Sequence, residues 1–516
     1  MNKWFNTAGP CKSDIHYMLP PTERLPKVRT LIDRQNYFVI HAPRQVGKTT
    51  AMLALAQELT EGGKYTAVML SAEVGAAFPH DPVEAQGAIL TEWQQSICFR
   101  LPSELQPTRW PAVDNSSQLS IFLSNWAVTS PRPLAFFLDE IDALSDETLI
   151  SILRQLRSGY PNRPKGFPHS LGLIGMRDIR DYKVKSGGGD RLNTASPFNI
   201  KVESLTMGNF TFTDVKTLYE QHTTATGQVF TPEALEYSFY LTDGQPWLVN
   251  ALARQATEDV VKDINQPITV EVIEEAKEIL IQRQDTHLDS LAERLREPRV
   301  RTIIEPILAG EELPDVPSDD IRYVLDLGLC QDKNGQGLEI ANPIYREVIP
   351  RVLTYTTRSS IGVIEPSWLS DQGELLPDKL LQVFLEFWRQ HGEPLLKSTP
   401  YPEIAPHLVL MAFLHRVVNG GGRLEREYAI GSGRMDICLR YGKVVMGIEL
   451  KVWHPKQKDP LNQGLKQLDK YLAGLNLETG WLVIFDRRPN LPPIGDRTTT
   501  QEVVSPAGRC ITVIRG

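Results

Sequence analysis

The segment APRQVGKTT, at positions 42–50, constrains the fold of this chain more than any other stretch. It follows a short apolar run, YFVIHAP, and precedes a helical pattern, TTAMLALAQEL. Small residues in such a turn allow its backbone N–H groups to wrap a phosphate, and the N-terminus of the next helix favours the anion. Gly47, Lys48 and Thr49 match the end of the pattern G-x-x-x-x-G-K-[ST]. The segment therefore predicts a strand, a phosphate-binding loop (P-loop) and a helix.

The residue types within this loop predict a division of roles. Lys48 would contact the β- and γ-phosphates of a nucleotide, and the hydroxyl of Thr49 would hold Mg²⁺. Ala42 replaces the opening glycine of the pattern but keeps that position small. With Gly47 and Thr50, it completes the set of expected nucleotide contacts.

A second apolar run, PLAFFLDEID at 133–142, ends in acidic residues. Because it is apolar on both faces, it predicts a buried strand of a parallel sheet. Asp139 would hold Mg²⁺ through water, and Glu140 would polarise the attacking water in nucleotide hydrolysis. By itself the segment is also compatible with a strand that ends in solvated acids. Its place downstream of the loop favours the Mg²⁺ site.

Strand and helix patterns alternate at the start of the chain, which predicts a doubly wound α/β layer with a parallel sheet. Ligands of such sheets bind at the carboxyl ends of the strands. Amphipathic helices follow, and then a helix, a turn, a short hairpin and a helix, as in a winged helix. We expect a multidomain α/β chain with an ATPase-like core (1–202), a helical lid (203–282), a winged-helix domain (283–358), a linker with a helix (359–395) and a C-terminal α/β domain (396–516).

The composition of the 516 residues, with 41% hydrophobic and 23% charged residues, is that of an ordinary globular protein. No run approaches the roughly 20 apolar residues of a membrane span, so we expect a cytoplasmic protein without a membrane partner. Five scattered cysteines show no metal-ligand spacing. The net charge of −8 means that any nucleic-acid surface must be local.

The segment GSGRMDICLRYGKVVMGIELKVW, at 431–453, predicts two strands around a turn. A two-residue loop would place Asp436 opposite Glu449, with Cβ atoms about 4.5–5.5 Å apart. Two carboxylates that close repel each other unless a divalent cation lies between them. Lys451 shares the face of Glu449 and could activate water or offset phosphate charge. The pattern fits metal-assisted phosphodiester hydrolysis, although an amphipathic hairpin with solvated acids remains the alternative.

A helical pattern, NQGLKQLDKYLAGL, follows this hairpin, and Gln467 and Tyr471 lie one turn apart on it. Basic residues outnumber acidic ones around the hairpin and the helix. Because phosphate contacts are driven by charge, this bias suits a nucleic-acid surface, although a solvated basic face would have the same composition.

The N-terminal motifs resemble the AAA/STAND group of ATPases over roughly residues 1–355. The resemblance rests on the P-loop, LAFFLDE, the strand end LIGMRD and a later Gly-Gln-Pro at 244–246. It implies ATP and Mg²⁺ as cofactors and self-association through the ATPase domain. It also implies that Arg177 senses the γ-phosphate and that Tyr17 lies near the adenine. The candidates for action on a neighbouring subunit are Arg154, Arg157 and Arg163, which follow the acidic strand. The sequence does not choose among them, and a solvated helix face is the alternative for each.

The C-terminal motifs resemble PD-(D/E)XK nucleases, in the branch with Gln-x-x-x-Tyr after the E-x-K strand, over about residues 400–490. This implies a restriction-endonuclease-like fold in which Asp436 and Glu449 bind Mg²⁺ or Mn²⁺ and Lys451 is catalytic. Gln467 and Tyr471 would support the site or contact nucleic acid.

Such folds also take an acid from their first helix. Glu403, ahead of the pattern HLVLMAFLHRVV, is the candidate, in competition with Glu425 and Glu427.

Together these features predict an ATP-binding and ATP-hydrolysing protein that regulates a metal-dependent nuclease acting on DNA. Closure of the lid on ATP would gate cleavage. A STAND-like switch or scaffold that binds nucleic acid without cutting it is the alternative, and a DNA-translocating motor is a third. The residues do not distinguish DNA from RNA.

Overall fold

A computed structural model describes most of the chain, and the residues it describes form two compact units. The first unit comprises Met1–Arg283 and Pro317–Gln331, and the second comprises Gln284–Val316 and Asp332–Gly516. The described residues are 3–111, 117–177, 200–283, 293–309, 313–332, 335, 337–360, 366–398, 405–418, 422–430, 433–455 and 457–516.

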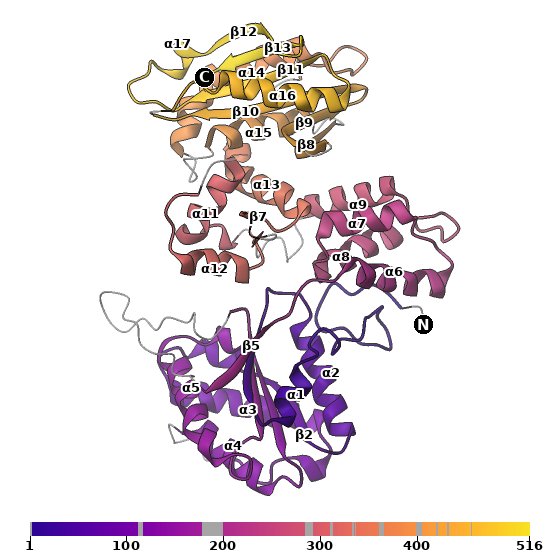
Figure 1. The fold of residues 1–516 in the computed structure, drawn as a ribbon, viewed down its shortest axis with the longest axis vertical. Coiled ribbons are helices and arrows are strands. Elements are labelled where there is room, and N and C mark those ends of the chain that lie inside the picture. The colour runs from indigo at the N-terminus through magenta and orange to yellow at the C-terminus, as the bar shows by residue number, and fades with distance from the viewer. Residues whose placement is uncertain are drawn as a thin grey trace. The chain divides into compact units, whose positions relative to one another are not determined.

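A parallel sheet, five-stranded over the described residues, forms the centre of the first unit (Figure 1). Its strands are β1 (Tyr37–His41), β2 (Thr66–Ser71), β3 (Leu134–Asp139), β4 (Ser170–Gly175) and β5 (Lys201–Thr206), in the order β2-β3-β4-β1-β5. The runs YFVIHAP, PLAFFLDEID and LIGMRD of the sequence correspond to β1, β3 and β4. β5 crosses the boundary expected at residue 202. Its alternating KVESLT carries few apolar residues because the strand lies at the sheet edge.

Helices cover both faces of this sheet, because alternate residues of each strand point to opposite sides. Phe136 and Leu138 of β3 pack in the same core as α3 (Pro82–Arg100), α4 (Gln118–Thr129) and α5 (Asp146–Gly159). Ala135 and Phe137 pack instead with α1 (Val28–Asp33) and α2 (Lys48–Glu61). The continuous apolar run that predicted a buried strand is therefore explained by two separate cores.

The lid predicted after the core is helical, with α6 (Phe212–Thr226), α7 (Pro232–Thr242), α8 (Pro246–Arg254) and α9 (Val270–Arg283). Local capping explains where these helices begin. Thr211 and Asp214 form a capping box at α6, and the side chain of Gln245 accepts a hydrogen bond from the Leu248 N–H at α8. Gly244 precedes this cap with a φ of 69°. The Gly-Gln-Pro sequence thus marks a helix start.

The helix, hairpin and helix expected in the winged-helix segment are present as local elements. They are α11 (Pro298–Ala309), α12 (Ser318–Asp326), the short strands β6 (Cys330–Asp332) and β7 (Leu338–Ile340), and α13 (Pro343–Ser360). Helix α12 belongs to the first unit, whereas α11 and α13 belong to the second. The division therefore runs through the segment predicted as one domain.

The second unit contains a separate mixed sheet, six-stranded among the described residues, in the order β12-β13-β11-β10-β9-β8. The central strands β10, β11 and β13 are parallel, and the outer neighbours are antiparallel. Its elements are α14 (Pro377–Ser398), α15 (Ala405–Val418), β8 (Gly422–Ile430), β9 (Gly433–Tyr441), β10 (Val444–Trp453), α16 (Leu461–Leu475), β11 (Thr479–Asp486), α17 (Ile494–Arg497), β12 (Thr499–Val504) and β13 (Cys510–Arg515).

Helices lie on both faces of this second sheet (Figure 1). Side chains of α14 and α15 share a core with Ile437, Leu439 and Ile448. Leucines of α16 pack with Cys438 and Leu482 on the other face. In neither unit does a described helix have the length and apolar character that crossing a bilayer demands.

The backbone at Gly244 predicts an unequal response to two glycine substitutions. A Cβ at Gly244 would lie 1.9 Å from the carbonyl oxygen of Phe210, whereas one at Gly227, with a φ of 84°, would meet no atom within 4 Å. Gly227→Ala should cost about 1–2 kcal/mol from left-handed backbone alone. Gly244→Ala should lose a further ~1–3 kcal/mol through backbone displacement. Thermal unfolding of the two variants checks this, and equal midpoints would contradict it.

Candidate functional site

The loop between β1 and α2 turns through left-handed backbone conformations, which glycine adopts readily. Gln45 and Gly47 both have positive φ values, 60° and 97°, and α2 begins directly at Lys48. A Cβ on Gly47 would approach the Arg24 Nη1 atom to 3.3 Å. The loop therefore curls so that the N-terminus of α2, with its unsatisfied N–H groups, faces the carboxyl edge of the sheet.

Lys48 is folded over this loop. Its Nζ atom donates hydrogen bonds to the carbonyl oxygens of Ala42 at 2.7 Å and Pro43 at 2.8 Å. Burial lowers the pKa of Lys48, while Asp142 and Asp139 act in the opposite direction. The loop thus holds a buried amine whose charged form has lost its contact with water. An anion bound beside this amine would stabilise the charged form.

Thr49 and Asp139 meet across the sheet edge. The Thr49 hydroxyl donates to Asp139 Oδ2 at 2.8 Å, and the backbone N–H of Glu140 donates to Asp139 Oδ1 at 3.0 Å. Asp139 is 3% exposed, and burial raises its pKa, opposed by these hydrogen bonds. Two hard oxygen donors beside a phosphate-binding loop are the ligand type that Mg²⁺ prefers, so the residues present fit this ion.

Two further acids follow Asp139. Glu140 is half-buried, with a φ of 54°, and its pKa is raised by burial and then by Asp139 and Asp142. The Oδ1 atom of Asp142 is buried and has no hydrogen-bond partner in the described part of the chain. A Cβ at Gly175 would lie 2.8 Å from that atom, so the end of β4 leaves room for Asp142. A carboxylate with a raised pKa suits a group that accepts a proton from water.

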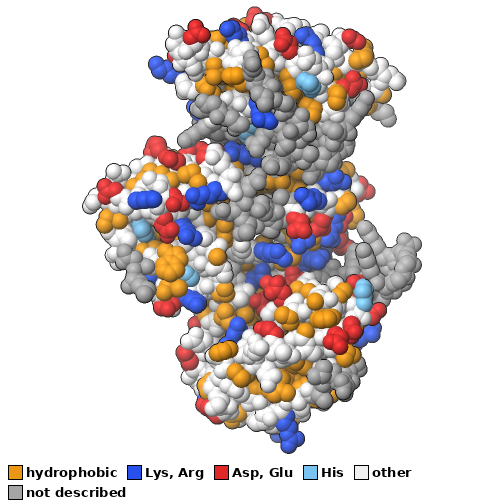
Figure 2. Space-filling view, turned by 180° about the vertical axis from the view of Figure 1, so that it is seen from behind, with side chains coloured by type: hydrophobic (Ala, Val, Ile, Leu, Met, Phe, Trp, Pro, Cys, Tyr) orange, Lys and Arg blue, Asp and Glu red, His pale blue; other side chains and the backbone are white. Residues whose placement is uncertain are grey.

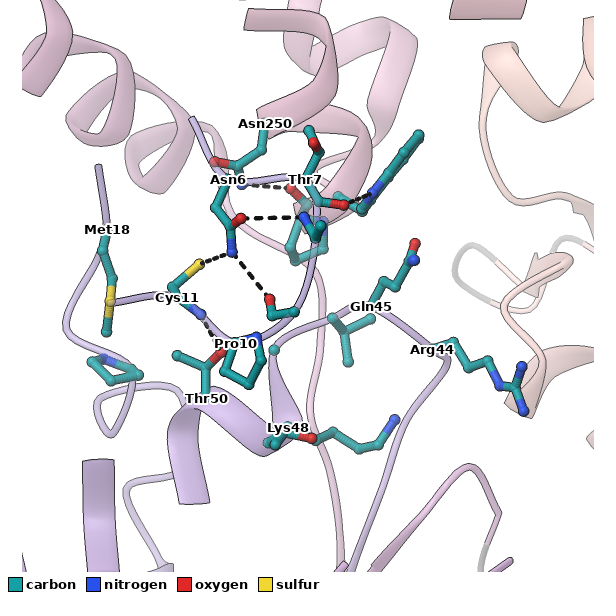
Figure 3. A pocket seen from close by; sticks show the side chains of 18 of the residues that line it. Asn6, Thr7, Pro10, Cys11, Met18, Arg44, Gln45, Lys48, Thr50 and Asn250 are labelled. Carbon is teal, nitrogen blue, oxygen red and sulfur yellow. Dashed lines mark hydrogen bonds between the residues drawn. The ribbon is translucent and has the colours of Figure 1, made fainter. Parts of the chain in front are cut away.

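A cavity of about 450 Å³ opens over this loop, within the range of small-molecule sites. Its lining comes from the N-terminal segment, the loop, the end of β3 and the start of α8, including Asn6–Cys11, Tyr17–Leu19, Arg44–Thr50, Asp139, Glu140, Asp142, Pro246, Trp247 and Asn250. Figure 3 shows Lys48 and Asn250 at opposite ends of the side chains drawn, with Asn6, Pro10 and Cys11 between them.

The N-terminal segment bridges the lid and the loop helix. Trp247 Nε1 and Arg254 Nη1, both of α8, donate to the carbonyl and hydroxyl oxygens of Thr7 at 2.8 and 2.9 Å. The Cys11 N–H donates to the hydroxyl of Thr50 at 3.1 Å. Sequence reasoning missed Asn6–Cys11 as part of the site, because the segment carries no phosphate-binding pattern.

Arg24 is a second feature without a sequence signal. Its Nη1 atom donates to the Val46 carbonyl oxygen at 2.6 Å, and its Nη2 atom donates to that of Gly208. The guanidinium lies 4.8 Å from the ring centroid of Phe210. Burial lowers the pKa of Arg24 to about 10, so it remains a cation at pH 7. It ties the phosphate-binding loop to the start of the lid.

The residues assigned by resemblance occupy different positions. Tyr17 and Pro246 line the cavity. Arg177 follows the pocket-lining Met176 but does not itself line the cavity, and its guanidinium lies 5.0 Å from the ring centroid of Tyr323. Its γ-phosphate role stays a prediction.

The candidate arginines for a neighbouring subunit also differ from one another. Arg154 and Arg157 are exposed on α5. Arg163 packs 3.4 Å from the ring centroid of Tyr160 and donates to its carbonyl oxygen at 2.9 Å. Arg163 therefore already packs against Tyr160 of the same chain, and the role of all three arginines stays a prediction.

In the second unit, the hairpin of β9 and β10 has the predicted two-residue turn. Tyr441 pairs with Val444 and Ile437 pairs with Ile448. The same register carried one residue further would set the backbone of Asp436 opposite Glu449. The side chains of Asp436, Glu425 and Glu427, and the whole of Glu403, lie outside the described residues.

Glu449 and Lys451 are brought together as predicted. Glu449 is 2% exposed, and Lys451 Nζ lies 2.8 Å from its Oε1 atom. Helix α16 packs over this face of the sheet with Tyr471, and it also carries Gln467, whose Oε1 atom is buried. Among the described side chains, no three His, Cys, Asp or Glu groups cluster as metal ligands.

Figure 2 shows basic and acidic side chains interspersed over the face in sight.

No family model and no curated protein matches the chain. It is similar to a Walker-type ATPase of Pyrococcus abyssi, with a TM-score of 0.47 and 11% identity over 67% of this chain and 99% of the other. Thermotoga maritima RuvB, a Holliday junction branch migration motor, matches with a TM-score of 0.34 and 13% identity over 63% and 92%. Cdc6p from Pyrobaculum aerophilum matches with a TM-score of 0.37 and 14% identity over 67% and 96%. These scores are too low to assign a function.

The burial of Asp139 predicts how stability depends on pH. A raised pKa means that the folded state favours the protonated acid, so this stability is present at low pH and is lost as the pH rises through the folded pKa. Asp139→Asn should therefore stabilise the nucleotide-free protein at pH 8 by about 0.5–2 kcal/mol, with the gain shrinking towards pH 4. Thermal unfolding across this pH range measures the difference.

Asp33 is a control of opposite sign. Its hydrogen bonds to Lys64 and Tyr65 lower its pKa, so Asp33→Asn should destabilise the protein at pH 8 and not at low pH. An Asp139→Asn variant that is less stable than the wild type at pH 8 would contradict the account of this site.

Proposed function

We propose that the first unit binds ATP with Mg²⁺ in the cavity over its loop and hydrolyses the γ-phosphate bond. The observation that carries this proposal is the 2.8 Å contact between the Thr49 hydroxyl and Asp139 Oδ2, directly beside the Lys48 amine. Backbone N–H groups at the start of α2 would bind the phosphates, and Lys48 would turn from the loop carbonyls towards them. When bound, Mg²⁺ neutralises charge on the phosphate oxygens.

Glu140 is the group that would accept a proton from the attacking water at its carboxylate. Its half-buried position and raised pKa support this assignment, because a base works best when its pKa is close to the working pH. Asn6–Cys11 and the start of α8 line the cavity and would limit the access of bulk water to the phosphates.

Replacing Glu140 should separate binding from hydrolysis. Glu140→Gln should leave the affinity for ATP within a few-fold of the wild type and lower the rate of phosphate release at least ~100-fold. Glu73→Gln is the matched control, because Glu73 also lines the cavity but is exposed, and it should keep most of the activity. Equal turnover in Glu140→Gln and the wild type would remove Glu140 from this role.

We further propose that nucleotide binding regulates the second unit through the segment Pro317–Gln331. This segment belongs to the first unit, while the chain on both sides of it belongs to the second. Asp326 Oδ1 lies 3.7 Å from His41 Nδ1 at the end of β1, and a Cβ at Gly328 would lie 2.7 Å from Pro43 of the loop. Movement of the phosphate-binding loop would therefore displace α12 and the residues that follow it.

For the second unit we propose a metal-dependent nuclease that hydrolyses phosphodiester bonds of DNA. The buried Glu449 and its pairing with the half-buried Lys451 support this, because removing an acid and its amine partner from water destabilises a strand that has only a structural role. The β9–β10 register, which would set Asp436 opposite Glu449, also supports it. A scaffold that binds nucleic acid without cutting is the competing proposal, and a motor would instead show DNA-stimulated ATP turnover.

Removing the amine of Lys451 should abolish nucleic-acid cleavage without affecting ATP binding. Lys451→Ala should show no cutting of single- or double-stranded DNA or RNA with Mg²⁺ or Mn²⁺, with and without ATP, while ATP affinity stays unchanged. Lys443→Ala, in the exposed hairpin turn, is the control and should cut like the wild type. Cleavage by Lys451→Ala at the wild-type rate would refute the site, and a wild type that binds nucleic acid without cutting it would favour the scaffold.

A further inference from the structure

Two residues that line the cavity carry a buried polar atom without a hydrogen-bond partner among the described residues: Asn250, at its Oδ1 atom, and Tyr17, at its hydroxyl. Asn250 is 7% exposed and Tyr17 is 2% exposed. A buried polar atom left without a partner destabilises the folded state, because it has lost its hydrogen bonds to water. Groups kept in that state at a ligand cavity point to a ligand that satisfies them.

The orientation of the Asn250 amide is set by its own helix. Its Nδ2 atom donates to the carbonyl oxygen of Pro246 at 2.8 Å, one turn earlier in α8. A carbonyl oxygen cannot donate, so the amide nitrogen must face it. The Oδ1 atom is therefore presented as a hydrogen-bond acceptor, and its ligand must supply a donor.

Asn250 lies far from the phosphate-binding end of the cavity. Figure 3 shows it across the drawn side chains from Lys48, with Asn6 and Cys11 between the two. In a nucleotide whose phosphates lie at Lys48, the group farthest from them is the base.

We propose, resting on the nucleotide-binding function above, that Asn250 Oδ1 selects adenine over guanine and hypoxanthine by accepting a hydrogen bond from the amine at position 6 of the purine ring. Guanine and hypoxanthine carry a carbonyl oxygen at that position of the ring. Two acceptors facing each other leave both without a donor, so such nucleotides bind more weakly.

Tyr17 has a different part in this recognition. Its ring lies 4.8 Å from that of Phe5 and 5.5 Å from that of His222, which holds the hydroxyl in place. A hydroxyl either donates or accepts, so Tyr17 adds affinity for a base without discriminating between bases.

The test compares the binding of ATP and ITP, which replaces the exocyclic amine by oxygen, to the full chain with Mg²⁺. The wild type should bind ATP about 10- to 100-fold more tightly than ITP. Asn250→Leu should weaken ATP and bring the two affinities within about two-fold. Tyr17→Phe should weaken both equally and leave their ratio unchanged.

The other outcomes separate this inference from the function on which it rests. Equal binding of ATP and ITP by the wild type overturns the selection by Asn250 but leaves nucleotide binding intact. This comparison uses only the wild-type chain, so it does not depend on the folding of a variant. An Asn250→Leu variant that loses discrimination between ATP and dATP instead would place Oδ1 at the ribose and overturn the inference. Absence of binding to both nucleotides would overturn the proposed function itself.

Discussion

The hydrogen bond between Thr49 and Asp139 is the contact on which the nucleotide site depends. Thr49 lies in the first turn of α2, after the loop that follows β1, and Asp139 ends β3. Strands β1 and β3 are not neighbours, because β4 lies between them. The loop must therefore reach across the end of β4, and Gly175 at that end has no side chain to block the approach of Asp142. Because the strands are parallel, the loop after β1 and the acids after β3 lie at the same edge of the sheet. This edge carries an amine, a hydroxyl and three acids.

Much of this edge could be predicted from the sequence, because each element carries its own local signal. The glycine and lysine of the loop, the apolar run that ends at Asp139 and the Gly-Gln-Pro before α8 all depend on neighbours in the chain. The two-residue turn between Tyr441 and Val444 was predictable for the same reason, and the pairing of its strands confirms it.

The residues that could not be predicted are those that reach the site through the tertiary fold. Arg24 donates to Val46 and Gly208, and Thr7 accepts from α8, yet neither stands in a recognisable pattern. Edge strand β5 was missed because an edge strand needs few apolar residues. Asn250 sits in an ordinary amphipathic helix, and only the hydrogen bond from its Nδ2 atom to Pro246 reveals that its Oδ1 atom is the end left to accept another bond. The placement of α12 with the first unit likewise depends on contacts far apart in the chain.

Thermal unfolding in the presence of ATP and Mg²⁺ tests the central claim most directly, since a ligand of the folded state raises its stability in proportion to the logarithm of the ligand concentration. The account predicts that the unfolding midpoint of the wild-type chain rises continuously as MgATP is added, and rises less when EDTA removes the ion. A midpoint that stays constant up to millimolar MgATP would contradict it.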